Sequence, residues 1–316
     1  MSVVFTFPGQ GAQRPGMIAD LSASEVVADT LAEASEVVGE DIHALDRRAA
    51  LADTRAVQIA LCVVGVAAAR DLIAAGATPD AVLGLSIGAW PAAVIAEAID
   101  FPDAVWLVAE RGRLMGAAYP DGYGMAAVIG LGESAVRSLL DKLNARAEPG
   151  HALYLANVNA DQQIVVAGSD PALADLERAA ATAGAQRVVR LDMAVPSHCA
   201  LMDEPARELG RIARDTVFHK PKLAYFSANR RRRLWTGADI RDDLVMNMAR
   251  TVHWADTARI VDESGFRLAV EMPPGRTLTR LHPPVEPPGE AIALADTGAA
   301  NTQALVARAR AGGQAV

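Results

Sequence analysis

Gly84-Leu85-Ser86-Ile87-Gly88 is the stretch that decides the fold, because it has the G-x-S-x-G form between an apolar run, Ala81 to Leu85, and a helical segment. The flanking glycines permit a turn sharp enough to lift the Ser86 hydroxyl over the end of a sheet. A helix amino terminus beneath the serine favours a developing negative charge. In a chain with 25 glycines the pattern can also arise by chance, but its position after a strand predicts a nucleophile at Ser86.

The surrounding segments predict an α/β fold with a parallel sheet. Val3 to Phe7 is a β-rich run closed by Pro8-Gly9, and a helix is expected from about Thr54 to Ala75. This helix is apolar on nearly every side, as expected for one packed between a sheet and other helices. Strands separated by helices indicate parallel pairing. Later segments include a strand at Leu268 to Glu271 and a terminal helix after Gly298 that frays beyond Gly312.

Residues 122–192 have a different order of elements, β-α-β-β-α-β, which is the ferredoxin-like unit. The expected elements are a strand at Met125 to Ile129, a helix from Glu133 to about Ala147, strands at Leu153 to Val158 and Gln163 to Ala167, a helix from Pro171 to about Ala183, and a strand at Arg187 to Leu191. We therefore predict a small subdomain at 122–192, inserted in a large α/β-hydrolase-like domain formed by 1–121 and 193–316.

Composition excludes several classes of protein. Apolar residues make up 51% of the chain and charged residues 22%, which is not typical of disorder. The formal net charge of −8 argues against nucleic acid as a main partner. Histidines and cysteines do not cluster at ligand spacing, so no metal site is indicated.

Two other features indicate a soluble, cytoplasmic protein without a membrane segment. Met1 to Phe7 lacks the pattern of a signal peptide, and the most apolar run, Val57 to Ala69, is shorter than the roughly 20 residues of a membrane span. The only cysteines, Cys62 and Cys199, suit reduced thiols.

Phe7-Pro8-Gly9-Gln10-Gly11-Ala12-Gln13 follows the first strand, at the sheet edge where open parallel sheets bind ligands. It is not a nucleotide-binding loop, because no third glycine follows at the required spacing and Gly16 precedes Met17 rather than lysine. Its backbone N–H groups could instead stabilise an oxyanion.

At this point the chain resembles the malonyl-CoA:acyl-carrier-protein transacylase family over nearly its whole length. The residues that match the family in order are the Pro-Gly-Gln-Gly-x-Gln segment, Thr54, Gln58, the serine turn, Arg111-Gly112 with Met115, Val195-Pro196-Ser197-His198 and Trp254. The resemblance implies that Ser86 attacks a thioester and that His198 accepts its proton. It also implies that the backbone N–H groups of Gln10 and Ile87 hold the oxyanion.

Two further roles follow from the resemblance. Arg111 would bind the free carboxylate of the malonyl group, because a planar guanidinium makes two parallel hydrogen bonds to a carboxylate. A backbone carbonyl at Asn247, where the family has glutamine, would orient His198 in a Ser-His dyad. Malonyl-CoA and an acyl carrier protein are the implied partners, with CoA and the carrier's phosphopantetheine-type thiol as substrates and no bound cofactor.

The residues alone leave alternatives open. By spacing, Arg111 could form a surface salt bridge with Glu110 or Asp103, and His198 could be a structural histidine. A serine hydrolase of the α/β-hydrolase type would use a histidine near the carboxyl end, here His282. A non-catalytic scaffold with the same fold is the third class. Arg230 to Arg233, expected in a loop, could bind phosphates or an acidic carrier, but a solvated turn is favoured.

The chain also departs from the family's pattern around the serine. Leu85, Ile87 and Ala89 replace the usual histidine, leucine and acidic residue, and Met272-Pro273-Pro274-Gly275 replaces Gly-Pro-Gly. These departures suggest the malonyltransferase (epsilon) subunit of malonate decarboxylase, whose acceptor is a dedicated carrier subunit. The alternative is a fatty-acid or polyketide malonyl-CoA:acyl-carrier-protein transacylase.

Overall fold

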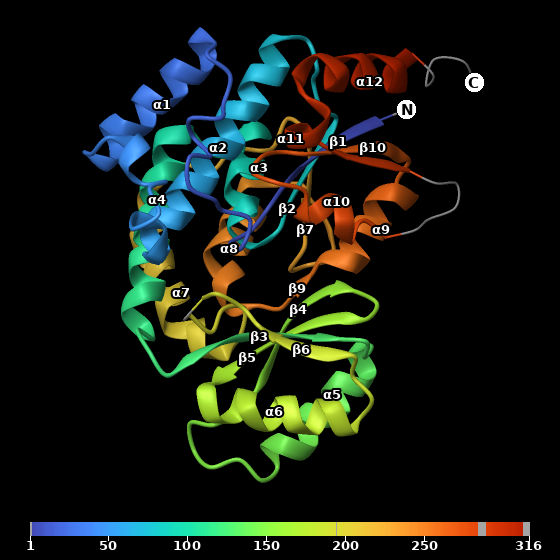
Figure 1. Cartoon of the computed structure of the whole chain (residues 1–316). Helices are drawn as coiled ribbons and strands as arrows, with labels where there is room; N and C mark the ends of the chain where they lie inside the picture. Colours follow the sequence, from blue (N-terminus) through green and yellow to red (C-terminus); the bar gives the residue numbers. More distant parts are fainter. Residues whose placement is uncertain (1, 194, 284–288, 312–316) are drawn as a thin grey trace.

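The protein has two sheets, one in each of two unequal parts of the chain (Figure 1). The computed structural model describes residues 2–193, 195–283 and 289–311. The larger sheet has the strand order β11-β10-β1-β2-β7-β8, and the smaller has the order β6-β3-β5-β4-β9. The predicted fold class, a parallel α/β domain with a ferredoxin-like subdomain, is confirmed.

The large sheet is parallel except at one edge. Its strands are β1 (Ser2–Phe7), β2 (Ala81–Gly84), β7 (Ala224–Ser227), β8 (Arg232–Leu234), β10 (Phe266–Glu271) and β11 (Glu290–Ala293). β1 pairs with β2 and β10 in parallel, and Phe7 lies opposite Gly84. The loops that follow β1 and β2, which carry the two glycine-rich segments, therefore leave the sheet at the same edge.

Helices surround this sheet on both faces (Figure 1). Those of the large domain are α1 (Glu25–Val38), α2 (Thr54–Ala74), α3 (Ala89–Ile95), α4 (Phe101–Ala118), α7 (Asp203–Ile212), α8 (Gly237–Met246), α9 (Trp254–Glu263), α10 (Thr277–Leu281), α11 (Leu294–Thr297) and α12 (Ala299–Ala311). The tail beyond Gly312, where fraying is predicted, lies outside the described residues.

α2 is the central helix of the large domain's core. It is longer than the apolar run in the sequence suggests, and its 21 residues would be long and apolar enough to cross a membrane. Its position shows why it is apolar: 83% of its most hydrophobic stretch is buried within the protein, and the helix packs against α1, α3 and α4. A helix enclosed by protein on nearly every side needs no polar face.

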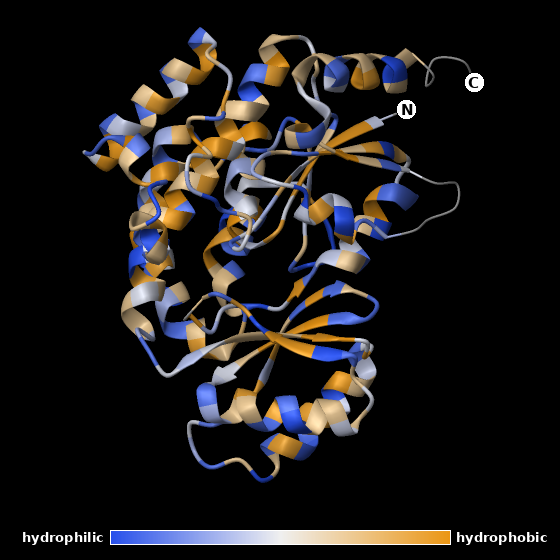
Figure 2. Ribbon diagram, in the orientation of Figure 1, coloured by the Kyte–Doolittle hydropathy of each residue, from blue (hydrophilic) through white to orange (hydrophobic). Residues whose placement is uncertain are grey.

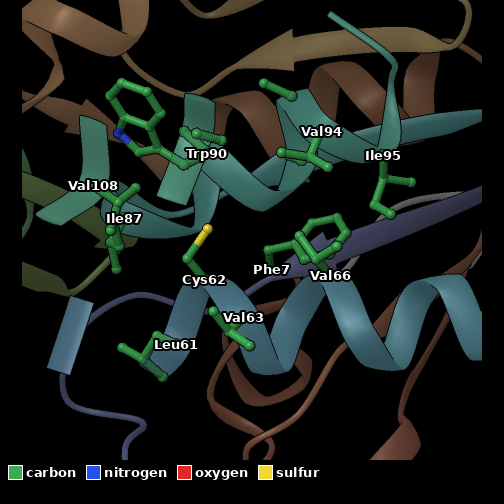
Figure 3. Close-up of a cluster of buried hydrophobic side chains, with 14 of the residues drawn as sticks. Phe7, Leu61, Cys62, Val63, Val66, Ile87, Trp90, Val94, Ile95 and Val108 are labelled. Atoms are coloured by element: carbon green, nitrogen blue, oxygen red, sulfur yellow. The ribbon is translucent and has the colours of Figure 1, made fainter. Parts of the chain in front are cut away.

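The core beneath the serine turn joins elements that are distant in sequence: β1, α2, the turn with α3, and α4. Figure 3 shows α2 side chains facing Phe7 of β1 and the residues of the turn and of α3. The labelled members are Phe7, Leu61, Cys62, Val63, Val66, Ile87, Trp90, Val94, Ile95 and Val108, and all belong to one buried cluster. β1 is hydrophobic along most of its length (Figure 2), as expected for a strand covered on both faces.

The small sheet has helices on one face only. Its strands are β3 (Tyr123–Ile129), β4 (Tyr154–Ala160), β5 (Gln163–Ser169), β6 (Arg187–Arg190) and β9 (Val252–His253), and its helices are α5 (Glu133–Asn144) and α6 (Asp170–Thr182). The helices pack against an apolar cluster that includes Val128 and Leu155, and Figure 1 shows them on the side away from the large domain. The other face is directed toward the large domain.

Two local expectations need correction. Arg230 to Arg233 do not all lie in a loop, because Arg232 and Arg233 begin β8, which pairs antiparallel with β7. The small sheet also gains β9 from outside the predicted range 122–192, through parallel pairing with β4. Both features depend on strand pairing between short segments, which sequence periodicity does not reveal.

α2 and α4 are in close contact at Gly112. A Cβ placed on Gly112 would lie 2.5 Å from the Cα atom of Arg55 at the start of α2, a distance that real side chains do not reach. One turn further along α4, a Cβ on Gly116 would lie 4.0 Å from Thr54, in ordinary contact. The close contact at Gly112 fixes the depth of the preceding residue, Arg111, in the protein.

This contrast provides a matched pair of variants. Gly112→Ala should lower the free energy of unfolding by about 1–3 kcal/mol, because backbone has to move to admit the methyl group. Gly116→Ala should raise it by about 0.5–1 kcal/mol, because alanine is the better helix former. Denaturant unfolding measures both. Equal effects of the two substitutions would contradict the assigned helix contact.

Candidate active site

Ser86 lies at a strained turn between β2 and a run of helix. The backbone of Ser86 is left-handed, with φ 56°, and the residue begins a short 3-10 helix, Ser86–Gly88, that continues into α3. A Cβ on Gly84 would lie 2.1 Å from the backbone of Gly88, and one on Gly88 would lie 2.1 Å from the carbonyl oxygen of Phe7. The turn therefore requires both glycines of the motif, and it holds the serine in a conformation that non-glycine residues rarely adopt.

His198 is hydrogen-bonded to Ser86. The His198 Nε2 atom is 2.7 Å from the Ser86 Oγ atom, and its Nδ1 atom is 2.8 Å from the carbonyl oxygen of Asn247. A carbonyl oxygen can only accept, so Nδ1 carries the proton and Nε2 is left to accept the proton of the serine. His198 also has a left-handed backbone, with φ 63°, and its N–H donates to the carbonyl of Met248.

The surroundings of His198 keep its imidazole neutral. Burial, together with the positive charge of the nearby Arg111, lowers the pKa of His198 from 6.5 to about 4. The hydrogen bond to the Asn247 carbonyl acts in the opposite direction but is outweighed. A neutral imidazole at physiological pH is the form that can act as a general base.

Arg111 is a buried cation. Its side chain is only 1% exposed, with Nη1 2.5 Å from the Gln58 Oε1 atom and Nη2 3.2 Å from the Asn247 Oδ1 atom. Among the described residues it has no carboxylate partner, and its Nε atom is buried without a hydrogen bond. Burial lowers the pKa of Arg111 to about 9.

The environment of Arg111 excludes the surface salt bridge that spacing alone allowed. Glu110 pairs instead with Arg113, at 2.7 Å on the outer face of α4. Since both partners of Arg111 are neutral amides, its charge is oriented but not compensated. The unpartnered Nε–H makes the guanidinium suitable for an incoming carboxylate.

Asn247 contacts both His198 and Arg111. Its backbone carbonyl accepts from His198, and its side-chain oxygen accepts from Arg111. Its side-chain amide donates to the Asn229 Oδ1 atom at 2.7 Å, and the Asn229 amide in turn donates to the carbonyl of Arg250 at 2.9 Å. The sequence resemblance indicated the carbonyl alone; the side-chain contacts and Asn229 were missed.

The site opens into a cavity of about 420 Å³ between the two parts of the protein. Residues from both parts line it: Gln10, Gly11, Gln13, Leu85, Ser86, Arg111, Met115, Met125, Asn157, Asn159, Gln163, Val165, Arg190, Leu191, Asp192, Met193, Ser197, His198, Thr277 and Leu281. The carboxamides of the small subdomain, Asn157, Asn159 and Gln163, were also missed by sequence reasoning. Their only sequence signal is a pair of asparagines two residues apart within an otherwise apolar strand.

The predicted oxyanion donors lie next to the nucleophile. Ile87 is the second residue of the short helix that begins at Ser86, so its N–H has no acceptor within that helix. Gln10 follows Gly9, at which a Cβ would lie 3.4 Å from the Ser86 Cβ atom. The loop after β1 thus lies beside Ser86, and Gln10 and Ser86 line the same cavity.

Other candidate residues lie elsewhere. The His282 Nε2 atom is 3.2 Å from the Asp262 Oδ2 atom, and His282 does not line the cavity that contains Ser86, so His282 is not placed as the base of a hydrolase. Arg230 and Arg231 face acidic side chains, and Arg233 stacks on Trp235 with 3.7 Å between its Cζ atom and the ring centre. In the described ranges, no group of three or more His, Cys, Asp or Glu side chains could hold a metal ion.

Comparisons with known proteins agree with this geometry. The acyl transferase domain family matches residues 4–305. The chain is 36% identical to the malonyl CoA-acyl carrier protein transacylase of Escherichia coli K12 over 283 residues, 88% of this chain and 90% of the relative. It is 30% identical to the Bacillus subtilis protein of that name over 299 residues, with 93% of each chain covered.

Solved structures resemble the whole chain. A malonyl-transacylase in complex with a type II polyketide synthase acyl carrier protein superposes with a TM-score of 0.90 and 33% identity, covering 98% of this chain and 100% of that one. The malonyl CoA-acyl carrier protein transacylase of Coxiella burnetii gives a TM-score of 0.90 and 30% identity, with 98% of both chains covered.

The low pKa of His198 predicts the pH dependence of serine reactivity. His198 has to be neutral to accept the proton, so labelling of Ser86 by a fluorophosphonate should slow only as the pH falls through about 4. Arg111→Met removes a positive charge that lowers this pKa, so the inflection should move upward toward 6.5. The measurement is the labelling rate between pH 3.5 and 8. A wild-type inflection at 6.5 or above would contradict the buried, neutral histidine.

The contacts of Asn247 predict that its side chain affects reaction with a dicarboxylic thioester but not the reactivity of Ser86 itself. Asn247→Ala keeps the backbone carbonyl that orients His198 but removes the amide that orients Arg111. Fluorophosphonate labelling should therefore change less than about twofold, while kcat/KM for a dicarboxylic thioester should fall about tenfold, the value of one charged hydrogen bond. Asn247→Gln should restore part of the loss. Parallel losses in both assays would show that the side chain supports the whole site.

Proposed function

This chain belongs to the acyl transferase family, and we propose that it moves a malonyl group from malonyl-CoA, through an ester on Ser86, to the thiol of an acyl carrier protein. The choice of a malonyl substrate rests on one observation: the Arg111 guanidinium is buried and has no carboxylate partner among the described residues. A malonyl thioester supplies the missing carboxylate on the group that is transferred. An acetyl group cannot do so.

In the first half-reaction, Ser86 gives its hydroxyl proton to the Nε2 atom of His198 while its Oγ atom attacks the thioester carbonyl. The negative charge that develops on the carbonyl oxygen lies toward the backbone N–H groups of Gln10 and Ile87. When the C–S bond breaks, the leaving CoA sulfur takes the proton from His198. The products are free CoA and a malonyl ester on Ser86.

The second half-reaction reverses these steps with a different thiol. The carrier's thiol gives its proton to His198 and its sulfur attacks the ester carbonyl. Ser86 regains the proton as the C–O bond breaks, so the enzyme is returned unchanged. The reaction exchanges one thioester for another and involves neither an oxidant nor a bound cofactor.

The substrate carboxylate also acts on the base. The positive charge of Arg111 lowers the pKa of His198, so a carboxylate bound to Arg111 offsets part of that effect. His198 therefore becomes a stronger base when a malonyl group occupies the site than when the site holds an uncharged acyl group. Selectivity for malonyl thus acts on the chemical step as well as on binding.

The identity of the carrier is a finer proposal. The relatives are named for transfer to an acyl carrier protein, which suits a fatty-acid or polyketide carrier equally well. The dedicated carrier subunit of malonate decarboxylase is favoured only by the departures at Leu85, Ile87, Ala89 and Met272-Pro273-Pro274-Gly275. Leu85 lies in the wall of the cavity and Ile87 is buried next to Ser86 in the chain. The substitutions at these two positions therefore alter the shape of the pocket. We place the reaction in the cytoplasm, in keeping with two free thiols, Cys62 and Cys199.

Intact-protein mass after brief exposure to malonyl-CoA or acetyl-CoA tests the proposal. Wild type should gain a malonyl adduct, and Ser86→Ala should gain none, because the nucleophile is absent. Arg111→Ala should lose at least tenfold in the rate of malonyl loading, because one charge-assisted pair is removed. Acetyl-CoA should load slowly on both wild type and Arg111→Ala.

Arg113→Ala is the matched control, since Arg113 lies on the same helix but is exposed and paired with Glu110. It should load malonyl at the wild-type rate. Equal loading of wild type by acetyl-CoA and malonyl-CoA would refute the role of Arg111. Absence of any adduct on wild type would favour the hydrolase or the scaffold alternative.

A further inference from the structure

Asn229 belongs to the network behind the active site rather than to the lining of the cavity. It is half-buried, two residues beyond the end of β7, and it is not one of the described residues that line the cavity. Its side-chain oxygen accepts a hydrogen bond from the Asn247 amide at 2.7 Å. Asn247 in turn contacts both His198 and Arg111. Asn229 can therefore act on the reaction only through other residues.

The direction of the hydrogen bonds around Asn229 is fixed at both ends. A guanidinium can only donate, so Arg111 identifies the Asn247 atom that it contacts as the side-chain oxygen. The Asn247 amide then points to Asn229, which presents its own oxygen. The Asn229 amide is left facing the carbonyl of Arg250, at 2.9 Å, and a carbonyl can only accept. One arrangement of the two carboxamides satisfies every bond, so each side chain orients the other.

The Asn229 amide also fixes the segment 247–251, which supports His198. Its Nδ2 atom lies within 3.5 Å of three carbonyl oxygens of this segment, those of Asn247, Arg250 and Thr251. His198 uses two carbonyls of the same segment, one for its Nδ1 atom and one for its backbone N–H group. The carbonyls that orient the base thus share a segment with those that the Asn229 amide holds.

Asn229 itself is held by the residues on either side of it. The buried Ser227 hydroxyl donates to the Asp243 Oδ1 atom at 2.6 Å and accepts from the backbone N–H group of Arg230 at 3.0 Å. Asp243 lies in α8, the helix that leads into Asn247. The end of β7 is therefore bonded to this helix, and the Asn229 carboxamide has a fixed position from which to support its neighbours.

We propose that Asn229 is a positioning residue with two separate effects: its oxygen orients Arg111 through Asn247, and its amide orients His198 through the segment 247–251. The inference rests on the proposed function, because the first effect concerns a carboxylate on the transferred group. The second effect concerns the base and applies to any acyl donor. Since different atoms of one carboxamide produce the two effects, substitution can separate them.

Two assays measure these effects. Labelling of Ser86 by an uncharged fluorophosphonate depends on the base, whereas kcat/KM for malonyl-CoA depends on both the base and Arg111. Asn229→Ala should slow labelling about tenfold and lower kcat/KM about a hundredfold, because one supporting bond is lost for each effect. Asn229→Asp keeps the oxygen that faces Asn247 and loses the amide. It should slow labelling and lower kcat/KM by the same factor, about tenfold.

A double variant tests whether the effect on Arg111 passes through Asn247. Asn229→Ala combined with Asn247→Ala should lose about a hundredfold in kcat/KM, no more than Asn229→Ala alone, because the second substitution removes an orientation that is already lost. Two independent effects would multiply to about a thousandfold.

Thr236→Ala is the control for a purely structural loss. Thr236 is the N-cap of α8, and its Oγ1 atom accepts from the backbone N–H group of Asp239 at 3.1 Å. Its replacement should lower the Tm and leave both assays unchanged, because it weakens α8 without removing a contact of the segment 247–251. If Asn229→Ala does not fold, Asn229→Ser takes its place with the same expected losses, because serine is too short to make either bond.

The possible outcomes separate the two effects. Equal losses of Asn229→Ala in the two assays, or a thousandfold loss in the double variant, would overturn the effect on Arg111 through Asn247. Unchanged labelling of Asn229→Ala would overturn the effect on His198. If wild type is labelled but does not load malonyl, the proposed malonyl transfer fails, while the labelling rates still test the effect on His198. Failure of the proposed function and failure of this inference are therefore distinguishable.

Discussion

The constraint on which the site depends is a positive charge, Arg111, buried without a negative charge to compensate it. Removing a cation from water is costly unless an anion accompanies it, and here two neutral amides, Gln58 and Asn247, only orient it. The close packing of α2 on Gly112 holds the guanidinium at depth. The same charge helps to keep His198 neutral. A substrate carboxylate bound to Arg111 would compensate its charge and, by doing so, raise the pKa of His198.

The two parts of the protein contribute different chemistry to one cleft. The large domain provides the nucleophile, the base and the cation, all at the edge where parallel strands end, as in other open α/β sheets. The small subdomain provides a face of amides and apolar side chains from β3, β4 and β5. β9 comes from the part of the chain assigned to the large domain and pairs with β4, so both parts of the chain contribute strands to the small sheet.

The sequence was sufficient for features that depend on local pattern. The strand-turn-helix around Ser86, the ferredoxin-like order and the buried α2 follow from periodicity and glycine placement, and the structure contains them. Contacts made by side chains far apart in the chain could not be predicted in this way. The Asn247 amide between Arg111 and Asn229 is one example. Another is the register shift in β4 between Leu155 and Asn157, which leaves Leu155 in the apolar cluster under the helices and Asn157 in the wall of the cavity. No spacing rule encodes either arrangement.

A crystal structure of the enzyme soaked with malonyl-CoA tests the central claim most directly. We predict electron density for a malonyl ester on Ser86, with its carboxylate on the Arg111 guanidinium and its carbonyl oxygen between the N–H groups of Gln10 and Ile87. Density for the carboxylate elsewhere in the cleft, with Arg111 still bound only to Gln58 and Asn247, would contradict the account.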